Sequence, residues 1–211
     1  FAPEKLAHMQ ALGAELTVLK SDNGRQTAAL VKAMIARATE IAAATNGTLT
    51  HQMENRDQLS AYTKMADEIW AQTNGKIDAL VQAVGTAASI RGMSTRLREL
   101  NPNIQIIAVE PAESAILSGG PTGAHKIDGI GAGYITPLWQ EGLAHAIEPV
   151  STADAKAMAA RLAKEEGILP GPSTGANVVA ALRVAARMGQ GAEIVTVMCD
   201  AGVKYLKGLA A

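Results

Sequence analysis

The sequence has little cysteine, few aromatic residues and no excess of positive charge. Its 211 residues include one cysteine, which excludes an internal disulfide and a cysteine-rich zinc site. Aromatic residues make up 3% of the chain, too few to suggest a surface that stacks nucleic-acid bases. The net charge of −1 lacks the basic excess of nucleic-acid binders and anionic-membrane binders. We therefore expect neither nucleic acid nor membrane as a partner.

Long hydrophobic runs are also missing. Hydrophobic residues make up 48% of the chain, but much of this is alanine, and no run approaches the roughly 18 residues of a membrane-spanning helix. The single cysteine fits a cytoplasmic setting. The chain starts at Phe1 without a signal peptide, and its first residues resemble the middle of a fold. We therefore expect a chain that is processed, truncated or only part of a longer polypeptide.

Short apolar segments alternate with segments of helical periodicity from end to end. Strands are expected at 15–20, 48–52, 77–84, 104–109 and 193–198, and helices at 2–13, 26–45, 58–73, 90–100, 152–166 and 176–188. This alternation predicts an α/β fold, a three-layer parallel sheet with helices on both faces. Ligands of such sheets bind beyond the carboxyl ends of the strands, so the loops at those ends are candidate sites.

Two loops at such ends carry hydroxyl groups and small residues. Residues 85–89 (GTAAS) join a buried strand to a helix, whose free N–H groups and partial positive charge suit a phosphate. An ordinary tight turn with a hydroxyl cap is the alternative. Residues 171–176 (GPSTGA) open another helix, where Ser173 or Thr174 is expected to be the N-cap. The alternative is a hydroxyl that faces the same pocket as residues 85–89.

The long segment 110–139 holds six of the 20 glycines and is expected to be a functional loop. Its Gly129, Gly131 and Gly133 form a GxGxG pattern without the flanking strand and helix of a dinucleotide site, so a pocket wall is the better interpretation. The four histidines show no metal-ligand spacing, Cys199 is expected to be an inert thiol, and no Gly-x-Ser-x-Gly elbow is present.

Seven segments in order resemble the fold-type-II pyridoxal-phosphate enzymes, which include tryptophan synthase β, and most closely the cysteine synthase (O-acetylserine sulfhydrylase) group. The most specific is HKIDGIGAGY at 125–134, which is similar to the family's HKIQGIGAGF. The seven segments are 11–16, 68–78, 85–89, 101–111, 125–134, 173–176 and 200–206. The resemblance implies β-replacement on O-acetylserine or a similar activated serine, with sulfide giving cysteine. It also implies a small amino-acid substrate and a homodimer.

The resemblance assigns roles to matching positions only. Ser173 would face the pyridine nitrogen of pyridoxal 5'-phosphate, and Gln52 would lie near the substrate carboxylate. The cofactor phosphate would be held by Gly85, Thr86, Ala87, Ala88 and Ser89, and the active-site wall would be lined by Gly129, Gly131 and Ala132. Residues 1–55 would be a remnant of the smaller N-terminal domain, and 56–211 the large cofactor-binding domain.

The chain departs from the family in three places. The family's Schiff-base lysine lies before the start of this sequence, and none of the ten lysines here stands in a matching motif, so no catalytic residue is assigned. Ala87 and Ala88 replace two glycines, and their methyl groups are expected to require ordinary φ angles. Residues 53–58 lack the family's prolines, which bears on substrate choice.

Other functions remain open on these residues. A serine or threonine dehydratase-like lyase would share the fold and the cofactor. A truncated, non-catalytic paralogue that binds a ligand or partner is favoured by the missing lysine and opposed by the intact loop at 85–89 and by Ser173. A nucleotide-binding module would need an acidic ribose-binding residue after the first glycine turn, and none stands at a fitting distance.

Overall fold

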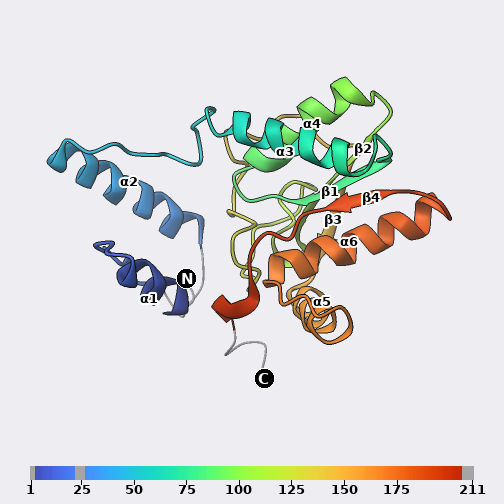
Figure 1. Ribbon diagram of the computed structural model, residues 1–211. Coiled ribbons are helices and arrows are strands. Elements are labelled where there is room, and N and C mark those ends of the chain that lie inside the picture. The colour runs from blue at the N-terminus through green and yellow to red at the C-terminus, as the bar shows by residue number, and fades with distance from the viewer. Residues whose placement is uncertain (1–2, 22–26, 206–211) are drawn as a thin grey trace.

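One parallel sheet organises the protein (Figure 1). The computed structural model describes residues 3–21 and 27–205, so Ala2, residue 26 and Leu206 of the expected segments lie outside them. The strands stand in the order β3-β2-β1-β4, and all three pairings are parallel. Their bounds are β1 Ala79–Ala83, β2 Gln105–Pro111, β3 Ala146–Val150 and β4 Ile194–Thr196. The predicted parallel α/β fold is thus confirmed.

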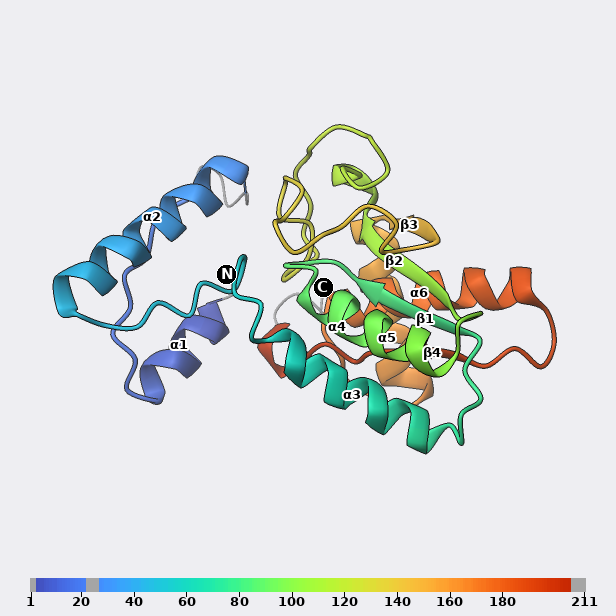
Figure 2. The ribbon, with the colours of Figure 1, turned by 90° about the horizontal axis from the view of Figure 1, so that it is seen from above.

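Helices cover both faces of the sheet (Figures 1 and 2). One face carries α3 (Leu59–Gln72) and α4 (Ala88–Leu100), and the other carries α5 (Thr152–Glu165) and α6 (Pro172–Met188). Because successive strand residues point to opposite faces, Leu80 packs into the core below α3 and α4, whereas Val81 packs into the core below α5 and α6. Burial on both faces explains why β1 is almost entirely apolar.

The first two helices lie apart from the sheet (Figure 2). They are α1 (Pro3–Ala11) and α2 (Ala28–Thr45). Thr27 caps the start of α2 by accepting a hydrogen bond from Leu30 N at 3.2 Å, and Asn46 ends it in the left-handed conformation, at φ 51°. Short 3-10 helices, η2 and η3, follow β2 and β4 at Ala112–Ser114 and Gly202–Tyr205.

Two predicted strands are wrong, and one strand was missed. Residues 15–20 and 48–52 form no strand, because no neighbouring strand pairs with them among the described residues. Val18 is 59% exposed, as expected for an apolar segment without such a partner. The missed strand is β3, an edge strand whose Glu148 and Pro149 interrupt the apolar pattern.

The N-cap of α6 also differs from the prediction. The helix begins at Pro172 and is capped by Gly171, which leaves Ser173 and Thr174 inside its first turn. Proline is favoured at the first helical position because its missing N–H has no helical partner there. The two hydroxyls are therefore free for contacts outside the helix.

The described residues also bear on membranes and metals. None of their helices has both the length and the apolar character that crossing a bilayer requires. Within the same residues, no three His, Cys, Asp or Glu side chains gather into a group that could hold a metal ion.

Candidate functional site

Two adjoining cavities lie where β1 and β4 end. The strand-end cavity has a volume of about 480 Å³ and is bordered by the 85–89 loop, the first turn of α6 and residues 197–200. The α2 cavity, about 530 Å³, lies between α2, residues 49–53 and the same 85–89 loop. The shared wall consists of Gly85, Thr86, Asp128, Gly129 and Ile130. Both cavities thus occupy the position at which open parallel sheets bind ligands.

The 85–89 loop presents hydrogen-bond donors to the strand-end cavity. Gly85, Thr86 and Ser89 line it, and the N-terminus of α4 begins at Ala88. The first N–H groups of a helix have no carbonyl partner within the helix, and the helix dipole makes this end partly positive. Thr86 Oγ1 accepts a hydrogen bond from Ala88 N at 3.2 Å, which fixes the turn.

Gly85 is needed for the close approach of a second loop. A Cβ atom at this position would lie 2.5 Å from the carbonyl oxygen of Gly129, closer than real contacts allow. The Gly129 backbone therefore packs directly onto the 85–89 loop. This contact closes the wall between the two cavities and makes the glycine-rich segment a pocket wall.

Ala87 contradicts the expectation that a methyl group here requires an ordinary φ. Its φ is 70° and its ψ is 0°, in the left-handed region. Neighbours hold the turn in place, because Thr136 Oγ1 donates to Thr86 O at 3.0 Å and Arg91 N donates to Ala87 O at 3.0 Å. The left-handed conformation costs an alanine about 1–2 kcal/mol. Ala87 and Ala88 are both buried, and neither lines the two cavities.

The first turn of α6 forms the opposite wall. Ser173 is buried and lines the strand-end cavity, beside Cys199. Thr174 Oγ1 accepts a hydrogen bond from Cys199 N at 3.0 Å, which ties the helix to the segment after β4. Desolvation by the surrounding protein raises the pKa of the Cys199 thiol, although the residue is exposed on one side, and a hydrogen bond with Ser173 offsets this only in part. A protonated thiol is a poor nucleophile, in line with the inert role predicted for Cys199.

Among the described residues, Lys5 is the lysine that lines the strand-end cavity. Its Nζ lies 2.9 Å from Asp128 Oδ2 and 3.7 Å from Asp200 Oδ2, and 4.8 Å from the ring centre of Tyr205. Burial alone would lower the pKa of Lys5, but the Tyr205 and Asp128 side chains outweigh it and raise that pKa. Lys5 is therefore a paired ammonium, whereas a Schiff-base lysine must attack as a neutral amine.

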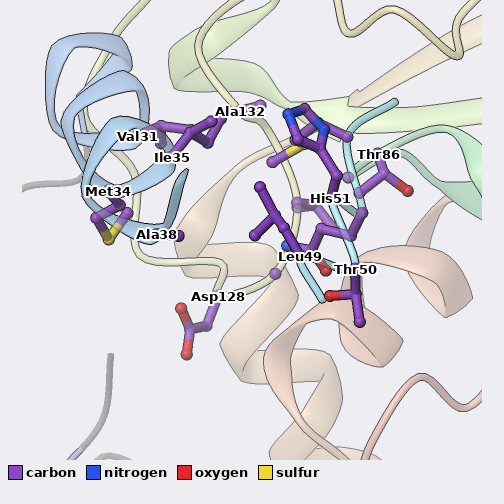
Figure 3. A pocket seen from close by; sticks show the side chains of 15 residues that line it. Val31, Met34, Ile35, Ala38, Leu49, Thr50, His51, Thr86, Asp128 and Ala132 are labelled. Carbon is purple, nitrogen blue, oxygen red and sulfur yellow. The ribbon is translucent and has the colours of Figure 1, made fainter. Parts of the chain in front are cut away.

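Gln52 and Ala132 lie in the α2 cavity, across the shared wall from Ser173. Figure 3 shows Val31, Met34 and Ile35 of α2 on one side of this cavity and Leu49, Thr50 and His51 on the other. The backbone oxygen of Gln52 accepts a hydrogen bond from Gln58 Nε2 at 2.7 Å. This hydrogen bond holds together the two ends of segment 53–58, which lacks the family's prolines.

Gly131, which was predicted to line the active-site wall, lies away from both large cavities. It borders neither large cavity but a small one of about 20 Å³ beside Glu110. Its N–H donates a hydrogen bond to Val84 O at 3.0 Å, which attaches the glycine-rich segment to the residue that follows β1. The structure thus groups Gly85, Thr86, Ser89, Gly129 and Ser173 around one cavity, with Gln52 and Ala132 in the next.

The sequence interpretation missed one polar residue of the strand-end cavity that stands inside the sheet. Gln82 is 5% exposed, belongs to β1 and lines the cavity. The available signal was an amide in the otherwise apolar strand ALVQA, one residue before the strand ends. Asp128 and Asp200, which hold Lys5, were also not singled out.

The residues around the strand-end cavity fit pyridoxal phosphate. The α4 N-terminus with the Thr86 and Ser89 hydroxyls is a donor set for a phosphate monoester. The Ser173 hydroxyl stands on another wall, and Met65, Met93 and Val197 supply apolar surface for a ring. The Oε1 atom of Gln82 is buried without a hydrogen-bond partner among the described residues. The donors and the ring-sized apolar surface match the two ends of the cofactor.

Known proteins that are similar to this chain have names that agree with the resemblance seen in the seven segments. Cysteine synthase 3 of Caenorhabditis elegans is 40% identical over 204 residues, which cover 96% of this chain and 59% of that protein. Among solved structures, O-acetyl serine sulfhydrylase isoform 3 from Entamoeba histolytica matches with a TM-score of 0.87 and 36% identity, covering 98% of this chain and 61% of that one. The O-acetylserine dependent cystathionine beta-synthase from Helicobacter pylori matches with a TM-score of 0.89 and 33% identity, covering 98% and 66%.

The chain therefore spans about three fifths of the length of the C. elegans and E. histolytica relatives. The sequence profile described as "Pyridoxal-phosphate dependent enzyme" matches residues 1–200, nearly the whole chain. This match confirms the resemblance seen in the seven segments, and with it the cofactor of the family. The chain belongs to the pyridoxal-phosphate dependent enzymes.

Proposed function

We propose that the protein containing this chain is a cysteine synthase-like enzyme. It would replace the leaving group of O-acetylserine, or of a similarly activated serine, with sulfide to give cysteine. The observation that carries the proposal is the meeting of two helix N-termini, α4 with Ser89 and α6 with Ser173, at one cavity beyond β1 and β4. Relatives named cysteine synthase and O-acetyl serine sulfhydrylase support this choice over a dehydratase.

In this proposal, the residues of this chain bind and orient the cofactor and the amino-acid substrate. The N–H groups of the 85–89 loop and the hydroxyls of Thr86 and Ser89 hold the cofactor phosphate. Ser173 would face the pyridine nitrogen, and its neutral hydroxyl would leave that nitrogen largely unprotonated. When bound, pyridoxal phosphate supplies an electron sink for carbanion chemistry at Cα. The small amino-acid substrate is held in the adjoining cavity by Gln52, Gly129 and Ala132, whereas Gly131 supports that wall from outside this cavity.

The amine that joins the cofactor comes, in this proposal, from outside residues 1–211. Lys5 reaches the cavity, but Asp128 keeps it charged and its pKa is raised rather than lowered. A lysine that acts as nucleophile and base needs the opposite shift, which desolvation without an anionic partner provides. Lys5 instead links α1 to the glycine-rich wall.

We also propose a domain division, an oligomeric state and a cellular location for the protein. Residues 1–55, with α1 and α2, would belong to the smaller domain, and 56–211 would form the large cofactor-binding domain. The protein would act as a homodimer in the cytoplasm, where a chain with one cysteine needs no disulfide partner. Light scattering on the purified full-length protein measures the oligomeric state directly.

Two measurements on the full-length protein test the function. The first is cysteine formation from O-acetylserine and sulfide, with serine and threonine deamination as the comparison reactions. The second is borohydride reduction followed by peptide mapping, which is expected to place a pyridoxyl group on a lysine outside residues 1–211. Deamination without cysteine formation would favour the dehydratase, whereas protein without any pyridoxyl group would favour the non-catalytic binding protein.

A further inference from the structure

A buried glutamine stands behind the 85–89 loop. Gln82 lies near the carboxyl end of β1, on the same face as Leu80, and is 5% exposed. Its side chain lines the strand-end cavity together with Ser89, Met93 and Ser173. An amide buried in the middle of a parallel sheet is unfavourable unless both of its polar ends are satisfied. Here only one end has a partner among the described residues.

That partner is the hydroxyl of Ser89. Gln82 Nε2 donates a hydrogen bond to Ser89 Oγ at 3.1 Å, and Gln82 Oε1 has no partner in the described part of the chain. Ser89 is half-buried in the first turn of α4 and borders the cavity. A hydroxyl oxygen that accepts from Gln82 keeps its own single proton for another acceptor.

The direction of this hydrogen bond decides what Ser89 can offer a ligand. With an amide N–H behind it, the hydroxyl donates its proton forward, toward the N-terminus of α4, where an anion is favoured. Hydrogen bonds in such a chain polarise one another, so the Gln82 bond strengthens the bond that Ser89 makes to an anion. With a carbonyl or carboxylate oxygen behind it, the hydroxyl would donate backward and present only lone pairs.

We propose that Gln82 is a positioning residue that makes Ser89 a hydrogen-bond donor to the cofactor phosphate. The inference rests on the proposed function, because it takes the phosphate to lie at the 85–89 loop. It adds a residue of the sheet interior to that site, one that acts on the ligand through Ser89 without touching it. It also accounts for a buried amide that an aliphatic side chain could replace with better packing.

The test compares the affinities of the full-length apoprotein for pyridoxal phosphate and for pyridoxal, which lacks the phosphate. The variants are Gln82→Met, which keeps the length and removes the donor, and Gln82→Glu, which places an acceptor behind Ser89. Ser89→Ala and the double variant Gln82→Met/Ser89→Ala complete a cycle. Urea denaturation of each apoprotein is measured in parallel.

Gln82→Met is expected to weaken pyridoxal phosphate binding about fivefold to tenfold, the usual size of one hydrogen bond between neutral groups. Gln82→Glu is expected to weaken pyridoxal phosphate binding further. The carboxylate accepts the hydrogen bond that Ser89 would otherwise donate to the phosphate, and its negative charge repels the phosphate. The affinity for pyridoxal should be unchanged. Gln82→Met should also raise the urea midpoint, since it removes a buried unpaired oxygen, and a variant that merely misfolds would lower it. The double variant should bind no more weakly than Ser89→Ala alone.

Three results would overturn the inference. If Gln82→Met weakens binding equally with and without Ser89, or weakens pyridoxal as much as pyridoxal phosphate, Gln82 acts on the fold and not through Ser89. If Gln82→Glu binds as tightly as the unchanged protein, the amide oxygen already faces Ser89. A Ser89→Ala variant with unchanged affinity for pyridoxal phosphate would instead show that the phosphate lies elsewhere, which overturns the proposed site itself.

Discussion

The Thr174 hydroxyl accepts a hydrogen bond from the backbone N–H of Cys199 at 3.0 Å. One residue is in the first turn of α6 and the other follows β4, so this bond joins two walls of the strand-end cavity. Asn177, one turn further along α6, reinforces the link, because its Nδ2 donates to Val197 O at 2.9 Å. The place of Ser173 against the cavity depends on this attachment.

Replacing Thr174 with valine should therefore destabilise the protein. Valine has the same shape but cannot accept the Cys199 N–H, and the loss of one such part-buried hydrogen bond costs about 0.5–1.5 kcal/mol. The free energy of unfolding from urea denaturation measures the loss. Thr174→Ser keeps the acceptor and is the matched control, expected to lose less than Thr174→Val. Equal losses in the two variants would show that the hydroxyl bond carries no stability.

A glycine at position 87 should stabilise the protein. Ala87 holds a φ of 70°, a conformation that glycine adopts without steric cost. The relief of about 1–2 kcal/mol is partly offset by the greater freedom of glycine in the unfolded chain, which leaves a net gain of about 0.5–1 kcal/mol. Thermal and urea denaturation both report this gain.

The neighbouring alanine provides the control for that experiment. Ala88 is the first residue of α4 and has no positive φ, so Ala88→Gly should lose about 0.5–1 kcal/mol. Opposite signs at two adjacent, buried alanines isolate the backbone conformation from the loss of a methyl group. A loss of stability in both variants would contradict the strain assigned to Ala87.

The ion pair between Lys5 and Asp128 should contribute stability at neutral pH that is lost at alkaline pH. The pKa of Lys5 is raised above its ordinary value of 10.5, so on the alkaline side its contribution is fully present up to pH 10.5 and is lost as the pH rises further. Because the pair is partly exposed, Lys5→Met should lose about 0.5–1 kcal/mol at neutral pH.

The measurement is the difference in unfolding free energy between the unchanged protein and Lys5→Met across the alkaline range. The difference should be flat up to pH 10.5 and shrink above it. Burial raises the pKa of Tyr205 to about 12, so this nearby phenol stays protonated through the first part of that range. Lys5→Arg keeps the charge and should retain most of the stability at every pH. A difference that grows with alkaline pH would contradict the raised pKa.

Most of the sheet could be predicted from the sequence because β1, β2 and β4 carry apolar runs that suit strands covered by helices. The edge strand β3 lacks such a run, since Glu148 and Pro149 interrupt it and Glu148 pairs with Arg187 of α6. Segments 15–20 and 48–52 have a strand-like composition but no neighbouring strand among the described residues. An apolar composition indicates that a segment can be buried, but it does not indicate whether another strand lies beside it to form backbone hydrogen bonds.

The candidate site could be predicted where it depends on the order of strands, turns and helices along the chain. Ser89 and Ser173 stand at the starts of helices that follow strands or tight turns, and parallel topology brings such starts to one edge. Ala87 was misjudged because the strain at its φ is imposed by contacts from distant residues such as Thr136. Gln82 was missed because its importance lies in one hydrogen bond to Ser89, which no sequence spacing announces.

We propose, above all, that the 85–89 loop holds the cofactor phosphate. A crystal structure of the full-length protein with pyridoxal phosphate bound tests it most directly. The account predicts the phosphorus at the N-terminus of α4, within hydrogen-bond distance of the loop N–H groups and of Ser89 Oγ, with the ring nitrogen beside Ser173. A phosphate bound anywhere else, with the 85–89 loop making no contact to it, would contradict the account.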